Sequence, residues 1–84
     1  MKHAGQTALD LLEPLLAEVR QRPELTERKR GVFYRRSRAW LHFHEDPAGL
    51  FADLKDETDW LRFDVTGPDG QAALLSRLDA QNAG

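Results

Sequence analysis

Two histidines in segment 41–46 are the residues whose type and spacing most clearly allow chemistry. His42 and His44 lie two residues apart, and on a strand this spacing points both imidazoles to the same face. Asp46 follows at the same interval, which gives the His-x-His-x-Asp spacing of metal ligands. Asp46 also begins the turn-forming sequence Asp-Pro-Ala-Gly, and this explains it without a metal. His42 and His44 are therefore weak metal candidates, and we predict no cofactor.

A second set of residues could perform acid–base chemistry. With the strand pairing described below, His42, Asp53 and Arg62 form one row across the sheet. Asp53 would then fix the tautomer of His42 while Arg62 bound an anionic substrate. The same row could be a ladder of polar cross-strand pairs, each stabilising the sheet by a few tenths to about 1 kcal/mol. Because no nucleophile is predicted near His42, we assign no catalytic residue and keep a small enzyme, or a metal- or anion-binding protein, as the alternative.

Apolar spacing predicts the helix that precedes these strands. A stripe at helical intervals indicates a helix over residues 7–22, capped by Thr7 or Asp10; it comprises Leu9, Leu12, Leu16 and Val19. Pro14 would kink this helix if it begins at Thr7, because proline removes an internal hydrogen bond. A polar connection over 23–31 follows, in which we expect Leu25 to pack at the edge of the core.

Four short segments between this helix and the C-terminus have the composition of strands: residues 32–36, 39–45, 50–55 and 60–65. The links of two to four residues between them can join only antiparallel neighbours, which predicts a four-stranded meander. A second helix begins near Thr66 and would bury Leu74, Leu75 and Leu78. We therefore predict one α+β domain over residues 1–84, in the order α-β-β-β-β-α, with both helices on one face of the sheet.

The loop lengths also predict which residues face each other. We expect Tyr34 to pair with Leu41, Phe43 with Ala52, and Ala52 with Phe63. Alternation then gives a core face of Val32, Tyr34, Leu41, Phe43, Leu50, Ala52, Leu54, Leu61, Phe63 and Val65. The opposite face would comprise Phe33, Arg35, Trp40, His42, His44, Phe51, Asp53, Lys55, Trp60, Arg62 and Asp64.

This opposite face is the surface to which we assign function. If the helices cover only the core face, it stays open, although it holds four large aromatic side chains. Clustered surface aromatics are typical of binding sites, unless long Arg and Lys stems cover them. The leading hypothesis is a non-enzymatic binding module that associates with itself or with another protein through this face.

Charge is unevenly distributed along the chain. Residues 20–38 contain eight basic and two acidic residues, whereas the rest of the chain contains four basic and twelve acidic ones. The basic segment could bind nucleic acid or phosphate, with the face aromatics as a stacking platform. It could also be neutralised by the acidic residues gathered in segment 45–64, or be solvated. We favour these alternatives because charge runs are usually surface features.

Length and composition exclude several classes of protein. A chain of 84 residues permits one domain, and 40% hydrophobic with 31% charged residues is an ordinary globular mixture. With no cysteine, the chain cannot form disulfides, thiolate metal sites or a cysteine nucleophile. No apolar run is long enough to span a membrane and no secretory signal is visible, so we expect a cytoplasmic location and no membrane partner.

Residues 31–54 resemble a group of small bacterial proteins of unassigned function. The likeness lies in the Phe33-Tyr34 hairpin, in Leu-His-Phe-His-Glu-Asp at 41–46 and in Gly-Leu-Phe-Ala-Asp-Leu at 49–54. It covers about a third of the chain. The resemblance implies a bacterial, cytoplasmic, stand-alone domain and no particular activity.

Overall fold

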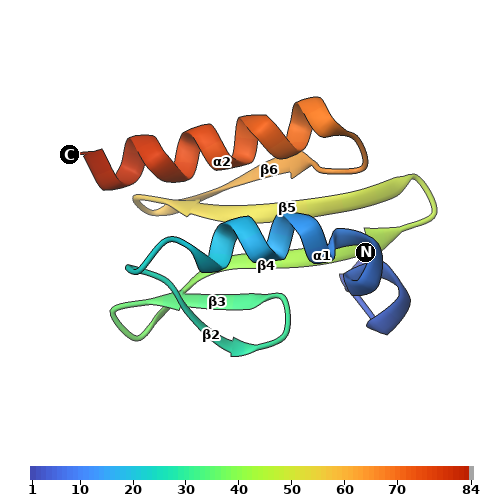
Figure 1. The fold of residues 1–84 in the computed structure, drawn as a ribbon, viewed down its shortest axis with the longest axis horizontal. Helices are drawn as coiled ribbons and strands as arrows, with labels where there is room; N and C mark the ends of the chain where they lie inside the picture. The colour runs from blue at the N-terminus through green and yellow to red at the C-terminus, as the bar shows by residue number, and fades with distance from the viewer. Residues whose placement is uncertain (84) are drawn as a thin grey trace.

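The structure, a computed structural model, describes residues 1–83 and is an α+β fold with two helices and an antiparallel sheet. The chain runs through β1 (Lys2–His3), α1 (Gln6–Arg20), β2 (Thr26–Lys29), β3 (Val32–Arg35), β4 (Arg38–Asp46), β5 (Gly49–Asp56), β6 (Asp59–Asp64) and α2 (Pro68–Ala83). Figure 1 shows this order along the colour gradient. Neither helix is long and apolar enough to cross a membrane, among the residues described.

The four predicted strands are present, and the sheet has two further strands that we did not predict. The sheet order is β2-β3-β4-β5-β6, and β1 pairs with β4. Because β5 occupies one edge of β4, β1 and β3 lie one after the other along its other edge. β1 has only two residues, and β2 (Thr-Glu-Arg-Lys) has no apolar alternation, so neither gives the usual signal of a strand. The connection predicted over 23–31 is therefore partly a strand, although Leu25 does pack against the core as expected.

A bulge in β4 changes the predicted register of the first hairpin. Phe33 pairs with Leu41, and Tyr34 pairs with Ala39 rather than with Leu41, so Trp40 has no partner residue on β3. The turn causes this shift. Arg36 and Ser37 both have positive φ values (51° and 68°), as in the two-residue turns that close hairpins. We had expected the turn one residue later, at Ser37 and Arg38.

The shifted register reverses the faces of the residues before the turn. Phe33 is 1% exposed and belongs to the core, and Trp40 packs against the core from the same side. Val32 and Tyr34, predicted in the core, lie on the opposite face instead, because the residues on either side of a buried strand position point away from it. The pairs Phe43–Ala52 and Ala52–Phe63 are confirmed, since the later turns have the expected lengths.

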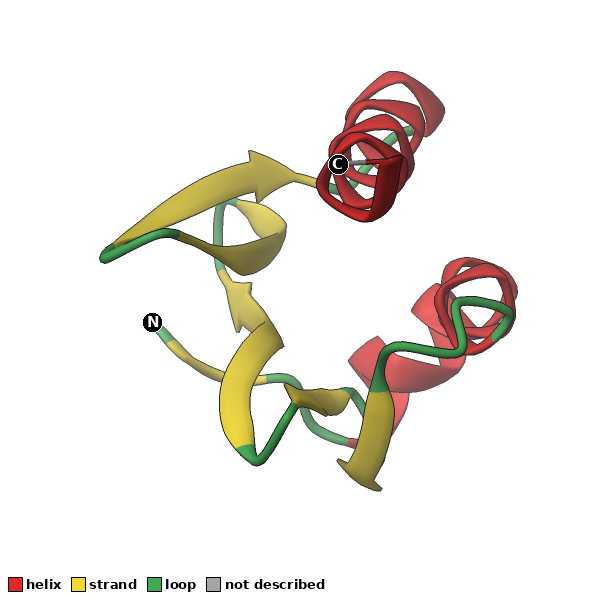
Figure 2. Ribbon diagram, turned by 90° about the vertical axis from the view of Figure 1, so that its left-hand side faces the viewer, coloured by secondary structure: helices red, strands yellow, loops and turns green. Residues whose placement is uncertain are grey.

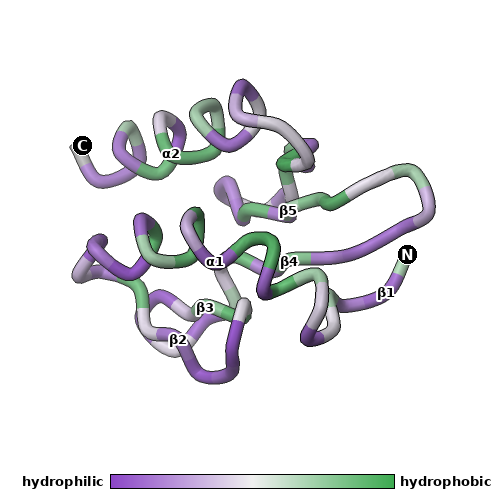
Figure 3. The backbone as a smooth tube through the Cα atoms, turned by 45° about the vertical axis from the view of Figure 1, so that its right-hand side comes forward, coloured by the Kyte–Doolittle hydropathy of each residue, from purple (hydrophilic) through white to green (hydrophobic). Residues whose placement is uncertain are grey.

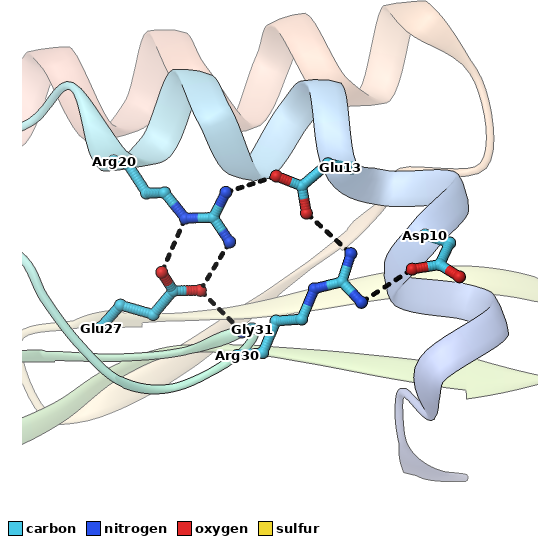
Figure 4. Close-up of polar contacts among 6 residues, drawn as sticks. All are labelled: Asp10, Glu13, Arg20, Glu27, Arg30 and Gly31. Carbon is cyan, nitrogen blue, oxygen red and sulfur yellow. Dashed lines mark hydrogen bonds and ion pairs between the residues drawn. The ribbon is translucent and has the colours of Figure 1, made fainter.

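The first helix begins at Gln6, with Gly5 at its N-cap and no side-chain cap, so neither Thr7 nor Asp10 has the capping role we predicted. Pro14 consequently lies inside the helix, where it cannot donate to the carbonyl of Asp10. The helix bends there, as expected for an early start: its first turns lie at an angle to the rest, near Asp10 in Figure 4.

Both helices pack on one side of the sheet, as predicted, and the core lies between the layers. Figure 2 shows α1 and α2 together on the same side of the curved sheet. The largest fully buried side chains come from all these elements: Phe33, Phe43, Leu12, Leu16, Leu41, Leu54, Leu74, Leu78, Val19 and Val65. Figure 3 shows hydrophobic and hydrophilic residues alternating along α1, while β2 is largely hydrophilic. No polar or charged residue is buried among those described, so the helix side of the sheet is an apolar core.

Candidate functional site

The side of the sheet away from the helices is called the histidine face below. It comprises His3, Val32, Tyr34, His42, His44, Phe51, Asp53, Lys55, Trp60, Arg62 and Asp64. Eight of the eleven residues predicted for this face are in this set. The other three, Phe33, Arg35 and Trp40, are on the helix side because of the bulge in β4. For these three the prediction was wrong.

Three imidazoles meet at the centre of the histidine face, and we name His3, His42 and His44 the histidine cluster. His3 pairs with His44 in the sheet, and the centroids of these two rings are 4.9 Å apart. The His3 ring also lies 5.7 Å from that of His42, and the His42 and His44 rings are 6.3 Å apart. From the sequence we had placed His3 far from the other two. A two-residue strand has no pattern that could have revealed this pairing.

Asp53 contacts His44 rather than His42, which corrects the predicted acid–base row. His42 and Asp53 are cross-strand partners, as expected, and so are Asp53 and Arg62. However, the Nε2 atom of His44 lies 3.2 Å from Asp53 Oδ2, whereas no hydrogen bond joins His42 to Asp53. Arg62 donates to both carboxylate oxygens of Asp53, from Nε at 2.8 Å and from Nη2 at 3.0 Å. The three side chains therefore lie in one series of contacts, from Arg62 through Asp53 to His44.

The electrostatics of the face favour neutral imidazoles beside an ionised carboxylate. Burial lowers the pKa of His42 below its usual 6.5; His3 and His44 lower it further, while Asp53 opposes the shift. Burial also lowers the pKa of His44, again against the opposing effect of Asp53. The hydrogen bonds from Arg62 lower the pKa of Asp53. Near pH 7 the face therefore combines the uncharged rings of His42 and His44 with an Asp53–Arg62 ion pair.

Two buried nitrogen atoms of the cluster have no hydrogen-bond partner in the part of the chain that the structure describes. They are Nε2 of His42 and Nδ1 of His44. An unsatisfied buried polar atom typically costs about 1–3 kcal/mol, so these imidazoles are poorly explained as a ladder that stabilises the sheet. The three rings also do not form a metal centre as they stand: within residues 1–83, no group of three or more His, Asp or Glu side chains is arranged to hold a metal ion.

An aromatic surface lies next to the cluster. Trp60, on the edge strand β6, is 43% exposed, and its ring lies 5.3 Å from that of His42. The ammonium group of Lys55, its cross-strand partner, lies 5.1 Å from the indole. Phe51 is half-buried between His44 and Asp64, and the Asp53–Arg62 row separates it from Trp60. Trp60 is therefore an exposed aromatic ring with charged groups around it.

Three of the eight basic residues in segment 20–38 form ion pairs with described acidic residues. Arg20 donates to Glu13 on its own helix and to Glu27 on β2, and Arg30 donates to Asp10 and Glu13 (Figure 4). The hydrogen bonds from Arg30 and Arg20 lower the pKa of Glu13. This network fastens β2, which lacks apolar contacts of its own, to α1.

Arg22 is neutralised at the other end of the chain. It forms two hydrogen bonds to Asp79 on α2, at 3.1 and 3.0 Å. The interpretation that basic residues of this segment are neutralised within the molecule is therefore right for Arg20, Arg22 and Arg30. Their partners lie on the helices and on β2, whereas the sequence predicted partners in the acidic segment 45–64.

Comparison of the chain with protein families, with curated proteins and with solved structures finds no match. The resemblance of residues 31–54 to small bacterial proteins stays a prediction.

Proposed function

We propose that the protein is a non-enzymatic binding module that associates with a second copy of itself through the histidine face. The observation that carries this proposal is the exposed Trp60 beside His42, on the side of the sheet that no helix covers. An indole that is 43% exposed next to uncharged imidazoles forms an apolar centre that association would remove from water. The same centre on two copies would provide matching contacts.

Charge on the histidine face also supports self-association. Arg62 and Asp64 are both exposed and lie two residues apart on β6, so the face presents both signs of charge. In a two-fold arrangement each Arg62 can approach an Asp64 of the other copy, which makes the surface complementary to itself. A surface with one sign of charge would instead repel its copy.

A second candidate function is binding of a small ligand at the histidine cluster, and one observation favours it. Asp53 Oδ2 lies 3.2 Å from Nε2 of His44, while Nδ1 of the same ring is buried and has no hydrogen-bond partner among the described residues. A carboxylate that orients an imidazole in this way is common where the free nitrogen acts on a ligand. This candidate replaces the predicted His42, Asp53 and Arg62 set with His44, Asp53 and Arg62.

Native mass spectrometry of the protein, purified without added metal or chelator, tests the proposal. We expect a dimer of unmodified chains. Trp60→Ala should weaken it about 30-fold, because truncation of a buried aromatic at an interface typically costs 2 kcal/mol or more. The matched control is Leu11→Ala, which removes a side chain that is 70% exposed on α1 and should leave the dimer unchanged.

Three results would overturn self-association through this face. A wild-type monomer at tens of micromolar concentration would remove the proposal altogether. A dimer that Trp60→Ala leaves intact would place the interface elsewhere. A monomer with an additional mass would favour the second candidate, and His44→Gln should then remove that mass.

A further inference from the structure

Besides Arg28, three arginines of the basic segment have no acidic partner among the described residues, in contrast to Arg20, Arg22 and Arg30. Arg35, Arg36 and Arg38 form no ion pair or side-chain hydrogen bond with any of the described residues. They lie together around the β3–β4 turn. The fold therefore separates the basic segment into a neutralised part and an unpaired part.

The three guanidinium groups share a pocket with one aromatic ring. Arg35, Arg36, Arg38 and Trp40 line a pocket of about 470 Å³, named the arginine pocket here. Its volume is in the usual range for small-molecule sites, roughly 300–1,000 Å³. Like charges gathered in one pocket repel each other, and a bound anion would remove that repulsion.

Part of the arginine pocket is held in place by α2. The indole Nε1 of Trp40 donates to Gln81 Oε1 at 3.1 Å, and the amide of Gln81 donates to the carbonyl of Lys55 at 2.8 Å. The guanidinium carbon of Arg35 lies 5.1 Å from the centroid of the Trp40 ring. A fixed ring thus positions Arg35, which lowers the entropy lost when Arg35 binds a ligand.

We propose that the arginine pocket binds the phosphate group of a small phosphorylated molecule. Guanidinium groups recognise phosphate oxygens through paired hydrogen bonds, and three of them match a group with two negative charges. A free small phosphate ester fits better than a nucleic-acid strand, because the chain outside residues 20–38 has twelve acidic and four basic residues and would repel a long polyanion. The pocket lies on the helix side of the sheet, so this proposal does not depend on the dimer.

Isothermal titration of the full chain with inorganic phosphate, ADP and a single-stranded oligothymidylate tests this site. We expect saturable binding of ADP that inorganic phosphate competes away. The double variant Arg36→Gln/Arg38→Gln should weaken ADP at least about tenfold, since hydrogen bonds between charged groups contribute about 1.5–3 kcal/mol. The matched control is Arg28→Gln/Lys29→Gln, which removes the same charge from exposed residues of β2 and should change affinity less than about twofold.

Each other outcome overturns the proposal. If neither phosphate nor ADP saturates the wild-type protein up to about 10 mM, the pocket binds no phosphate. This result does not depend on the folding of any variant. Equal losses in the two double variants would indicate general charge attraction. Oligonucleotide binding that is tighter than ADP binding, and that the pocket variant removes, would assign the phosphate to a nucleic-acid backbone instead of a small molecule.

Discussion

The two sides of the sheet use the same strands for different purposes. On the helix side, Phe43 and Leu54 are no more than 1% exposed and belong to the apolar core. On the histidine face, their sequence neighbours His44 and Asp53 keep polar atoms, an ion pair and a nitrogen without a partner. The helix side holds the apolar core, and the histidine face is the surface through which we propose that the protein binds.

This contrast teaches how a very small domain can separate stability from binding. Alternation along β4 and β5 assigns each residue to one side, so a change on one side need not disturb the other. The predictions below test that independence.

The largest effect should come from the core. Phe43→Ala should lower the free energy of unfolding by about 3–5 kcal/mol, because it leaves a cavity beneath both helices. The adjacent substitution on the other side, His44→Ala, should cost about 1 kcal/mol or less. Urea denaturation of both variants measures the difference. Similar losses would mean that the two sides do not differ in their contribution to folding.

A smaller effect is expected from the ion pair. Asp53→Asn removes the carboxylate that Arg62 holds, and it should cost about 1 kcal/mol, because the Arg62 side chain is 54% exposed and the interaction is screened by solvent. It should also lower the pKa of His44, since Asp53 is the main group that raises it. Titration followed by NMR reports the pKa. Asp59→Asn, at an exposed position of β6, is the control and should leave the His44 resonances unchanged.

The smallest effect concerns pH. The pKa values of His42 and His44 are lowered by burial, so the unfolded chain binds protons more readily than the folded one. Their contribution to stability is complete above pH 6.5 and is lost as the pH falls from 6.5 through the lowered values. The double variant His42→Gln/His44→Gln should therefore lose less stability than the wild type between pH 7.5 and 5.5 in urea denaturation. An unchanged pH dependence would show that the two imidazoles are not protected from protonation by folding.

The class of fold and most of the pairing could be predicted from the sequence, because β4, β5 and β6 alternate cleanly and are joined by short turns. The bulge at Trp40 could not be predicted from the sequence. The choice between turns at 36–37 and 37–38 depends on backbone strain and on how Phe33 and Trp40 fill the core. That single shift moved Phe33, Arg35 and Trp40 to the other side. His3 was missed for a different reason: a two-residue strand forms through its partner β4 and not through its own sequence.

The arginine pocket follows from the same shift. With the predicted turn, Arg35 and Trp40 would have joined the binding face. With the observed turn, Trp40 is hydrogen-bonded to α2 and both residues line a separate pocket. The sequence singled out the basic segment, but it could not show which of its arginines are neutralised by Glu13, Glu27 and Asp79. Which arginines are neutralised depends on acidic residues that lie far from them in the sequence.

Fluorescence quenching of Trp60 tests the central claim most directly. Trp40→Phe leaves Trp60 as the one tryptophan, so acrylamide quenching reports the histidine face alone. We predict that Trp60 becomes harder to quench and emits at shorter wavelength as the protein concentration rises through the dimer dissociation constant. Quenching of Trp60 that stays the same at every concentration, in a chain that remains folded, would contradict the claim that copies of this protein meet through the histidine face.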